Sequence, residues 1–457
     1  MQLGAGVSVV RGAGSATRAG RIARIRRPTC AQCLGAASLD GRPRQPDKVL
    51  FHSGRPRPSA WAAAVSVAGN IVSNAVSRAT KGDLPTIDPL RIVAKEMKFL
   101  TGNIRKLLGS GHPSLDRAAK YYTQSEGKHI RPLIVLLMSR ATSLCPKAPH
   151  CQQATLQASA AIDTSISPLS ILADNNPSAG LESEPVLADA NGILPSQRRL
   201  AEITELIHTA SLLHDDVIDH SVSRRGAPSA NLEFGNKMAV LAGDFLLGRA
   251  SVALARLRHA EVIELLATVI ANLVEGEFMQ LKNTARDEAN PQWSEDTLTY
   301  YLRKTYLKTA SLISKSCRAA ALLGGADAQT VDAAYSYGKN LGLAFQLVDD
   351  LLDYTRSEAE LGKPAGADLE LGLATAPLLF AWKTIPELGL LVGRKFSHEG
   401  DVERARHLVM QSDGIEQTRA LAQDYAEKAI ASLSLFPESE AKDGLIEMAV
   451  KTLRRQK

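Results

Sequence analysis

His208-Thr-Ala-Ser-Leu-Leu-His-Asp-Asp-Val-Ile-Asp219 is the stretch on which the predicted fold and chemistry depend. In a helix, residues four apart lie on one face, so Asp215 and Asp219 stack, with Ser211 and His208 on the turns before them. A separate apolar stripe contains Leu206, Ala210, Leu213 and Val217. Neighbouring carboxylates repel one another unless a cation lies between them, and Mg²⁺ prefers oxygen ligands. The stretch therefore predicts a helix with a metal-binding face.

A second acidic cluster, Phe345-Gln-Leu-Val-Asp-Asp-Leu-Leu-Asp353, repeats the same D-D-x-x-D pattern. On a helix Gln346, Asp350 and Asp353 share a face, and Asp349 lies beside it. One such cluster is usually a solvated helix surface. Here both copies stand among Leu, Val, Ala and Phe, where unpaired charges are costly. We therefore expect both clusters to line one cavity that cations fill.

Basic residues near these clusters indicate a phosphate-bearing ligand. Gly127-Lys-His-Ile-Arg-Pro132 leads into an apolar helical run, and a helix start with positive side chains favours anions. Six carboxylates would repel a phosphate, so metal ions must bridge them to it. Metal and guanidinium groups stabilise charge on a departing diphosphate. Loss of an allylic diphosphate leaves a carbocation, which requires an apolar cavity that excludes water.

The rest of the sequence has the pattern of helices separated by turns. Asp88 is expected to cap a helix from Pro89 to about Leu108, and a second helix follows Pro113-Ser114. Further helical patterns cover about 236–257, 260–282, 294–323 and 328–354, and three or four more helices fill 374–454. Because no alternating strand pattern of useful length occurs, we predict an all-α fold. One domain should span 84–457, with a disordered insertion at 144–197.

The first 83 residues differ in composition from the rest. Residues 1–95 carry 15 Lys and Arg against 4 Asp, and the first Glu is Glu96. A basic segment rich in Arg, Ser and Ala is typical of a mitochondrial transit peptide, and a basic tail without a targeting role is the alternative. Since the remainder has a net charge of −5, the high overall pI does not support nucleic-acid binding. Five cysteines without paired metal spacing are consistent with a reducing compartment.

In combination, these motifs resemble those of the trans-isoprenyl diphosphate synthases, especially the long-chain polyprenyl diphosphate synthases of ubiquinone side-chain synthesis. The resemblance covers roughly 85–457 outside the insertion, and includes G-K-x-x-R-P, R-R-G after the first aspartate cluster, K-T-A, F-Q-L-V-D-D-x-L-D and G-K-x-x-x-x-D-L. It implies a helical bundle around a central cavity. It also implies that isopentenyl diphosphate is added repeatedly to an allylic diphosphate primer, with loss of diphosphate and a proton at each five-carbon step.

The resemblance also assigns residues. Isopentenyl diphosphate is expected at Lys128, Arg131, His208 and Arg225, and the allylic diphosphate at Arg224, Lys308, Thr309, Gln346 and Lys363. Mg²⁺ is expected at Asp215, Asp216, Asp219, Asp349, Asp350 and Asp353. Catalysis should depend most on Asp215, Asp219, Asp349, Asp350 and Lys308. The residues alone do not decide which phosphate each arginine contacts.

Two positions depart from the family pattern. Leu373 stands where many relatives have Lys, which removes one cation from the phosphate side. The surrounding Gly-Leu-Ala-Thr is similar to the mitochondrial quinone-chain branch. His129 stands where many relatives have Arg, which would weaken one phosphate contact or make it pH-dependent.

Small residues one turn before Asp215 predict a long product. Ala210 and Ser211 stand where short-chain relatives place a bulky aromatic as the floor of the cavity. We therefore expect the growing chain to pass them, and Ala210→Phe to shorten the product.

Two other classes of protein fit part of the pattern. A non-catalytic partner subunit of a heteromeric synthase typically lacks aspartates that are all present here. An all-α terpene cyclase shares an aspartate-rich helix but needs no site for isopentenyl diphosphate. The resemblance also implies a homodimer or higher oligomer, leaves a heteromer open, and places the chain in the mitochondrial matrix. No uninterrupted apolar run is long enough to span a bilayer, so only peripheral inner-membrane contact stays open.

Overall fold

The computed structural model describes residues 87–124, 129–149, 162, 192–224, 227–281, 291–355 and 366–455, all within one compact unit, Pro58–Lys457. The predicted leader and most of the predicted insertion lie outside these residues. The described helices, in chain order, are α2 (Pro89–Ile92), α3 (Ala94–Leu107), α4 (Pro113–Gln124), α5 (Ile130–Ser143), α8 (Pro195–Ile218), α9 (Ala230–Phe234), α10 (Asn236–Arg256), α11 (Ala260–Leu281), α12 (Glu295–Thr305), η2 (Tyr306–Ala310), α13 (Ser311–Leu323), α14 (Ala328–Thr355), α16 (Ala367–Glu370), α17 (Ala376–Trp382), α18 (Glu387–Gly393), α19 (Asp401–Gln411), α20 (Gly414–Ser432), η3 (Leu433–Leu435) and α21 (Glu440–Leu453).

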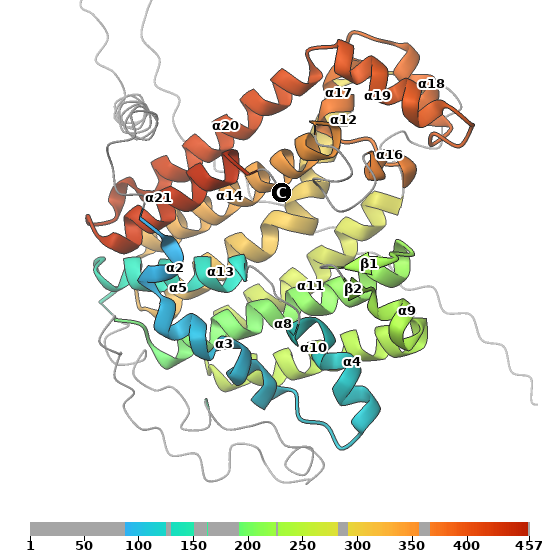
Figure 1. Ribbon diagram of the computed structural model, residues 1–457. Coiled ribbons are helices and arrows are strands. Elements are labelled where there is room, and N and C mark those ends of the chain that lie inside the picture. The colour runs from blue at the N-terminus through green and yellow to red at the C-terminus, as the bar shows by residue number, and fades with distance from the viewer. Residues whose placement is uncertain are drawn as a thin grey trace, which may run out of the picture. The chain divides into compact units, whose positions relative to one another are not determined.

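The all-α prediction is confirmed. Within the described residues the only strands are β1 (Ser223–Arg224) and β2 (Ala227–Pro228), a two-residue antiparallel pair beside the end of α8. The predicted helices at 236–257, 260–282 and 328–354 match α10, α11 and α14 to within about one residue. Figure 1 shows α10 and α11 side by side, α14 apart from them beside α20, and the shorter α16–α19 at one end.

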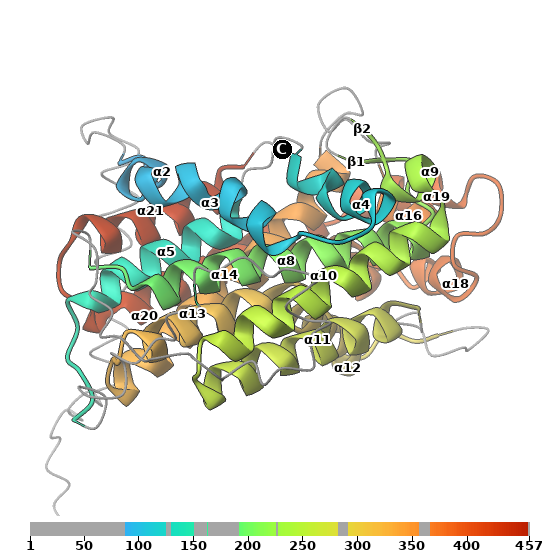
Figure 2. The same ribbon diagram turned by 90° about the horizontal axis from the view of Figure 1, so that it is seen from below.

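The helix α8 lies at the centre of this arrangement, packed against α5, α10 and α13 (Figure 2). Pro195 begins the helix, where a missing backbone N–H costs nothing. The Gln197 amide oxygen accepts from the Leu194 N–H at 2.9 Å, and its nitrogen donates to the Ala320 carbonyl at 2.8 Å. One side chain therefore caps α8 and ties it to α13. Sixteen residues along α8 are buried, and they include polar and charged side chains as well as apolar ones.

The predicted amphipathic helix at 294–323 is interrupted. Residues Tyr306–Ala310 form a π-helical turn, which is wider than an α-turn and often occurs at functional sites. Neighbouring helices approach it closely through glycines. A Cβ built on Gly276 would lie 3.0 Å from the backbone nitrogen of Lys308. A Cβ built on Gly342 would lie 2.6 Å from the Ala310 Cα. The missing side chains therefore make room for the turn that carries Lys308 and Thr309.

Buried apolar side chains form two clusters. The larger contains residues of α3, α5, α8, α10, α11, α13 and α21, together with the first half of α14. The smaller contains residues of α12, α17, α18, α19 and α20, together with the second half of α14. Asp215 therefore follows the larger cluster along α8, whereas Asp350 stands within the part of α14 that belongs to the smaller one. The two aspartate clusters are carried by different parts of the core.

Candidate active site

The carboxylates of Asp215 and Asp219 are half buried at the C-terminal end of α8. Burial raises the pKa of Asp215 to about 6; Lys308 opposes the shift, and Glu277 and Asp219 add to it. Burial also raises the pKa of Asp219. A raised pKa means that the ionised carboxylate is disfavoured where it stands, so both groups would gain from a bound cation. This is the behaviour predicted for a metal-binding face.

Asp216 is fully buried, and the structure engages both of its oxygens. Tyr122 donates its hydroxyl hydrogen to Oδ2 and accepts the Ala230 N–H at 2.7 Å. Arg224 donates to Oδ1 from Nε at 2.9 Å and from Nη2 at 2.5 Å. Asp216 thereby fixes the guanidinium of Arg224 beside the other two aspartates. Direct metal binding by Asp216 stays a prediction.

The second cluster has a matching arrangement around Asp350, which is 2% exposed. Tyr301 donates its hydroxyl hydrogen to Oδ2, and the Ala376 N–H donates to the same oxygen at 3.4 Å. Gln346 donates to Oδ1 at 3.0 Å and accepts from the Thr309 hydroxyl at 2.8 Å. Thr309 and Gln346, predicted separately, therefore belong to one hydrogen-bonded chain that ends at Asp350. In both clusters a buried tyrosine from another helix holds the second aspartate.

The remaining aspartates of this cluster bind different partners. Asp349 is half buried and forms an ion pair with Arg455, from Nη1 to Oδ1 at 2.7 Å. The same guanidinium lies over the Phe345 ring, 4.1 Å from its centroid. Asp353 is buried and accepts the Asp368 N–H at 3.3 Å. Asp349 is thus the member of this cluster most open to exchange its partner for a metal ion.

One cavity of about 200 Å³ collects residues from both aspartate helices. Its lining is strongly polar, and comprises Asp219, Gln280, Tyr301, Lys304, Thr305, Lys308, Thr309, Gln346, Asp350, Asp368, Leu373 and Thr375. The predicted allylic-site residues Lys308, Thr309 and Gln346 meet here, between Asp219 of α8 and Asp350 of α14. Lys308 pairs with Glu277, from Nζ to Oε2 at 2.6 Å. We refer to this space as the diphosphate cavity.

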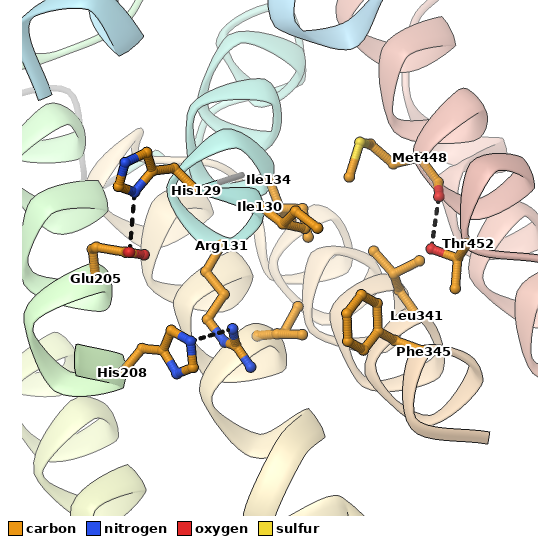
Figure 3. A pocket seen from close by; sticks show the side chains of 11 residues that line it. His129, Ile130, Arg131, Ile134, Glu205, His208, Leu341, Phe345, Met448 and Thr452 are labelled. Carbon is orange, nitrogen blue, oxygen red and sulfur yellow. Dashed lines mark hydrogen bonds and ion pairs between the residues drawn. The ribbon is translucent and has the colours of Figure 1, made fainter. Parts of the chain in front are cut away.

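Arg131 and His208 line a second cavity of about 140 Å³ (Figure 3). Arg131 Nη1 lies 2.8 Å from His208 Nε2, and the two side chains point toward each other from α5 and α8. His129, in a left-handed backbone conformation, bonds through Nδ1 to Glu205 Oε1 at 3.0 Å. The far side is apolar and includes Phe345. Two residues predicted to hold isopentenyl diphosphate therefore meet, whereas His129 is directed to a carboxylate.

Some predicted residues do not appear in either cavity. Lys128, Arg225 and Lys363 lie outside the described residues. Ala210 is fully buried in the larger apolar cluster, and the Ser211 hydroxyl donates to the His208 carbonyl at 2.9 Å. The position of the product channel relative to Ala210 and Ser211 stays a prediction.

Other cavity residues were not assigned from the sequence. Lys304 and Asp368 line the diphosphate cavity, and Glu277 pairs with a lysine that does. Glu277 and Asp368 fall in motifs that the sequence shows, because Glu277 follows Gly276 and Asp368 is the aspartate of G-K-x-x-x-x-D-L, whereas Lys304 falls in none. Tyr122 and Tyr301 carry no such signal, since tyrosines in amphipathic helices are usually core residues.

The donor set suits a hard divalent ion that also binds a ligand. Within the described part of the chain, no group of three or more His, Cys, Asp or Glu side chains is arranged to hold a metal by itself. The carboxylates of Asp215 and Asp219 could supply oxygen ligands from one helix, and that of Asp349 could supply another from α14. Mg²⁺ usually keeps few protein carboxylates and completes its coordination with phosphate and water. The residues therefore fit Mg²⁺ bound together with a diphosphate.

Comparisons with known proteins agree with this geometry. Residues 179–409 match the family described as polyprenyl synthetase. The chain is 82% identical over 429 residues to a protein of Neurospora crassa named probable hexaprenyl pyrophosphate synthase, mitochondrial, covering 93% of this chain and 95% of that one. It is 49% identical over 367 residues to decaprenyl-diphosphate synthase subunit 1 of Schizosaccharomyces pombe, covering 80% and 91%.

Solved structures give the same result. A polyprenyl synthase from Caulobacter crescentus, crystallised with calcium and isoprenyl diphosphate, superposes with a TM-score of 0.64 at 31% identity, covering 81% of this chain and 97% of that one. The similarity to solved structures confirms the predicted isoprenoid-synthase bundle. The named relatives confirm the predicted long-chain prenyl-transfer activity and mitochondrial location. The chain belongs to the polyprenyl synthetase family.

Proposed function

We propose that this chain makes a long-chain polyprenyl diphosphate for the ubiquinone side chain, by Mg²⁺-dependent head-to-tail condensation of isopentenyl diphosphate onto an allylic diphosphate. The observation that supports this most directly is the diphosphate cavity, which receives both aspartate helices and two lysines. Only a ligand that is strongly anionic, and accompanied by metal ions, would neutralise both kinds of charge.

Five of the six aspartates have a proposed task. Asp215 and Asp219 would hold metal on the α8 side, and Asp349, which pairs with Arg455 in the structure, would hold it on the α14 side. Bound Mg²⁺ supplies positive charge that stabilises the departing diphosphate. Asp216 and Asp350 position other groups: the first orients Arg224, and the second orients Gln346 and Thr309 toward the diphosphate. Metal contact by Asp216, Asp350 and Asp353 is not required for these tasks.

The condensation proceeds by bond exchange between the two substrates. The allylic C–O bond breaks, and its electron pair leaves with the diphosphate, whose charge Lys308 and Arg224 stabilise. The double bond of isopentenyl diphosphate then forms the new C–C bond, and the product loses a proton. Arg131 and His208, together with Lys128 and Arg225, are proposed to hold the second diphosphate. The released diphosphate is the proposed proton acceptor.

An assay of the purified chain alone tests the function. Farnesyl diphosphate and labelled isopentenyl diphosphate should give products that grow in five-carbon steps, read by mass. Because the carboxylates require a bridging cation, EDTA should abolish elongation, and added Mg²⁺ should restore it. Elongation that appears only after a second polypeptide is added would instead support the hypothesis that this chain is a partner subunit of a heteromeric synthase. Products that lack isopentenyl-derived label would support a cyclase.

Product length tests the proposed role of the residues before Asp215. Ser211→Phe and Ala210→Phe should both shorten the main product by one or more five-carbon units, because the ring would block the channel. Ala210 is fully buried, so the larger side chain also overpacks the core at a cost of roughly 1–3 kcal/mol, whereas Ser211 is half buried. Mass analysis of the products shows whether the channel is blocked, and the melting temperature of each variant shows whether the core is overpacked. An unchanged length in both variants would contradict the channel assignment.

We further propose that the chain forms homodimers through α10 and α11. These helices form an antiparallel pair on which Leu241, Val274 and Phe278 are 54–62% exposed. Among the helices the structure describes, α10 alone is long and apolar enough to span a membrane by composition, yet it packs against α8 and α4. An exposed apolar face on a packed helix is typical of an interface with a second copy.

Light scattering after size exclusion tests the homodimer. Phe278→Asp should shift the mass toward the monomer, because a charge would be buried at the interface. Phe99→Asp, at a phenylalanine of α3 that is 55% exposed, should leave the mass unchanged. A wild-type mass equal to one chain at micromolar concentration would disprove the dimer.

A further inference from the structure

Lys304 is a buried cation in the diphosphate cavity to which neither the motifs nor the family resemblance gave a task. It lies in the last turn of α12 and is 8% exposed. Its ammonium is 5.3 Å from the centroid of the Tyr301 ring. Asp350 and Asp368 attract it, but no described carboxylate lies within ion-pair distance of its nitrogen. The side chain therefore faces the cavity without the close anionic partner that a buried ammonium normally has.

The other cations around the site each have such a partner. Lys308 pairs with Glu277 at 2.6 Å, Arg224 with Asp216 at 2.5 Å, and Arg455 with Asp349 at 2.7 Å. Burial lowers the pKa of Lys304, and the attraction of Asp350 and Asp368 opposes this shift. A lysine that served the core alone would direct its nitrogen to solvent or to a carboxylate at contact distance. Lys304 instead has room for an anion beside it.

The cavity wall formed by 373–375 carries no compensating charge. Leu373 and Thr375 line the same cavity as Lys304, and both are neutral. Lys304 and Lys308 are four residues apart, and both line this cavity. Two ammonium groups on one side match a ligand with two linked phosphates, each of which offers its own oxygens.

We propose that Lys304 binds the diphosphate of the allylic substrate and supplies the positive charge that the wall at Leu373 lacks. This inference rests on the assignment of the cavity to the allylic diphosphate. Lys304 keeps its proton throughout, and its charge stabilises the electron pair that leaves with the diphosphate oxygen. It would act on the allylic substrate and on released diphosphate, and not on isopentenyl diphosphate in the cavity of Arg131.

Steady-state kinetics of Lys304→Met test the proposal. We expect KM for the allylic diphosphate, and the inhibition constant of inorganic pyrophosphate against that substrate, to rise about tenfold, since a lost charge-assisted contact has about this effect. KM for isopentenyl diphosphate should change by less than about twofold. Arg303→Met is the matched control, because this neighbouring side chain is 67% exposed and pairs with Glu275. If Lys304→Met is insoluble, Lys304→Gln tests the same contact.

A rescue experiment separates binding from a structural role. Adding Leu373→Lys to Lys304→Met returns a cation to a residue that lines the same cavity, and should recover most of the lost pyrophosphate affinity. Equal losses for both substrates, a lowered melting temperature and no rescue would make Lys304 a structural residue and overturn the proposal. Unchanged constants would overturn it as well.

Lys308→Met distinguishes this failure from failure of the site assignment. If Lys308→Met raises KM for the allylic substrate and Lys304→Met does not, only the role of Lys304 is wrong. If neither variant changes that KM, the cavity does not hold the allylic diphosphate, and the proposed function loses its supporting observation.

Discussion

Replacing Asp215 with alanine should lower turnover by at least about a thousandfold, which corresponds to roughly 4 kcal/mol in the barrier. Burial raises the pKa of Asp215 to about 6, and the carboxylate interacts electrostatically with Lys308 and Asp219. Its removal takes away an oxygen ligand that no neighbouring side chain can replace. Single-turnover elongation, measured over a range of Mg²⁺ concentrations, would detect the loss. Asp244→Ala is the control, because that side chain is 62% exposed on α10.

Asp216→Asn gives the informative contrast to Asp215→Ala. An amide can still accept from Arg224 and donate to Tyr122, so the guanidinium stays in place while the negative charge disappears. We expect a moderate rise in KM for the allylic substrate and an unchanged Mg²⁺ requirement. A Mg²⁺ requirement raised as strongly as that of an Asp219 variant would show that Asp216 is itself a metal ligand.

Gly342→Ala should produce the largest loss of stability among single-methyl changes near the site. The added Cβ would lie 2.6 Å from the Ala310 Cα and 2.7 Å from its Cβ, so the backbone of the π-turn would have to move. Overpacking of this kind costs about 1–3 kcal/mol. The displacement would also separate Thr309 from Gln346, now 2.8 Å apart. Calorimetry should show a lower melting temperature, and activity should fall beyond what the unfolded fraction explains.

Gly102→Ala provides the matched comparison for Gly342→Ala. A Cβ at Gly102 of α3 meets nothing within 4 Å, so alanine should be neutral or stabilise the helix by about 1 kcal/mol. If both variants have the same melting temperature, the structure tolerates an added methyl group beside Ala310. The packing would then not require glycines beside the π-turn.

Helix positions and the paired aspartate walls could be predicted from the sequence because both depend on local spacing. The 3.6-residue period located α10, α11 and α14 closely. Two D-D-x-x-D motifs in apolar surroundings predicted one shared cavity, and Asp219 and Asp350 do line one. Leu373 was identified as facing the phosphate side by family resemblance, and it lines that cavity too.

Features that depend on contacts between distant segments could not be predicted. Tyr122 reaches Asp216 across 94 positions, and Tyr301 reaches Asp350 across 49, so no local pattern reveals either bond. The π-turn interrupts a continuous amphipathic pattern, because its wider geometry is stabilised by glycines of other helices. The same limit applies to Lys304, because its burial and its place in the cavity beside Leu373 and Thr375 depend on segments far apart in the sequence.

The division of the core between two apolar clusters has a consequence for inactivation by heat. Tyr337 and Leu341 place one half of α14 in the larger cluster, and Leu347 and Val348 place the other half in the smaller one. Segments with fewer buried contacts open locally at lower free energy than the whole chain unfolds. On warming, the end of α14 that carries Asp349 and Asp350 should therefore loosen while α8 is still folded. A substrate analogue that spans both walls should delay the loss of activity more than the loss of helical signal.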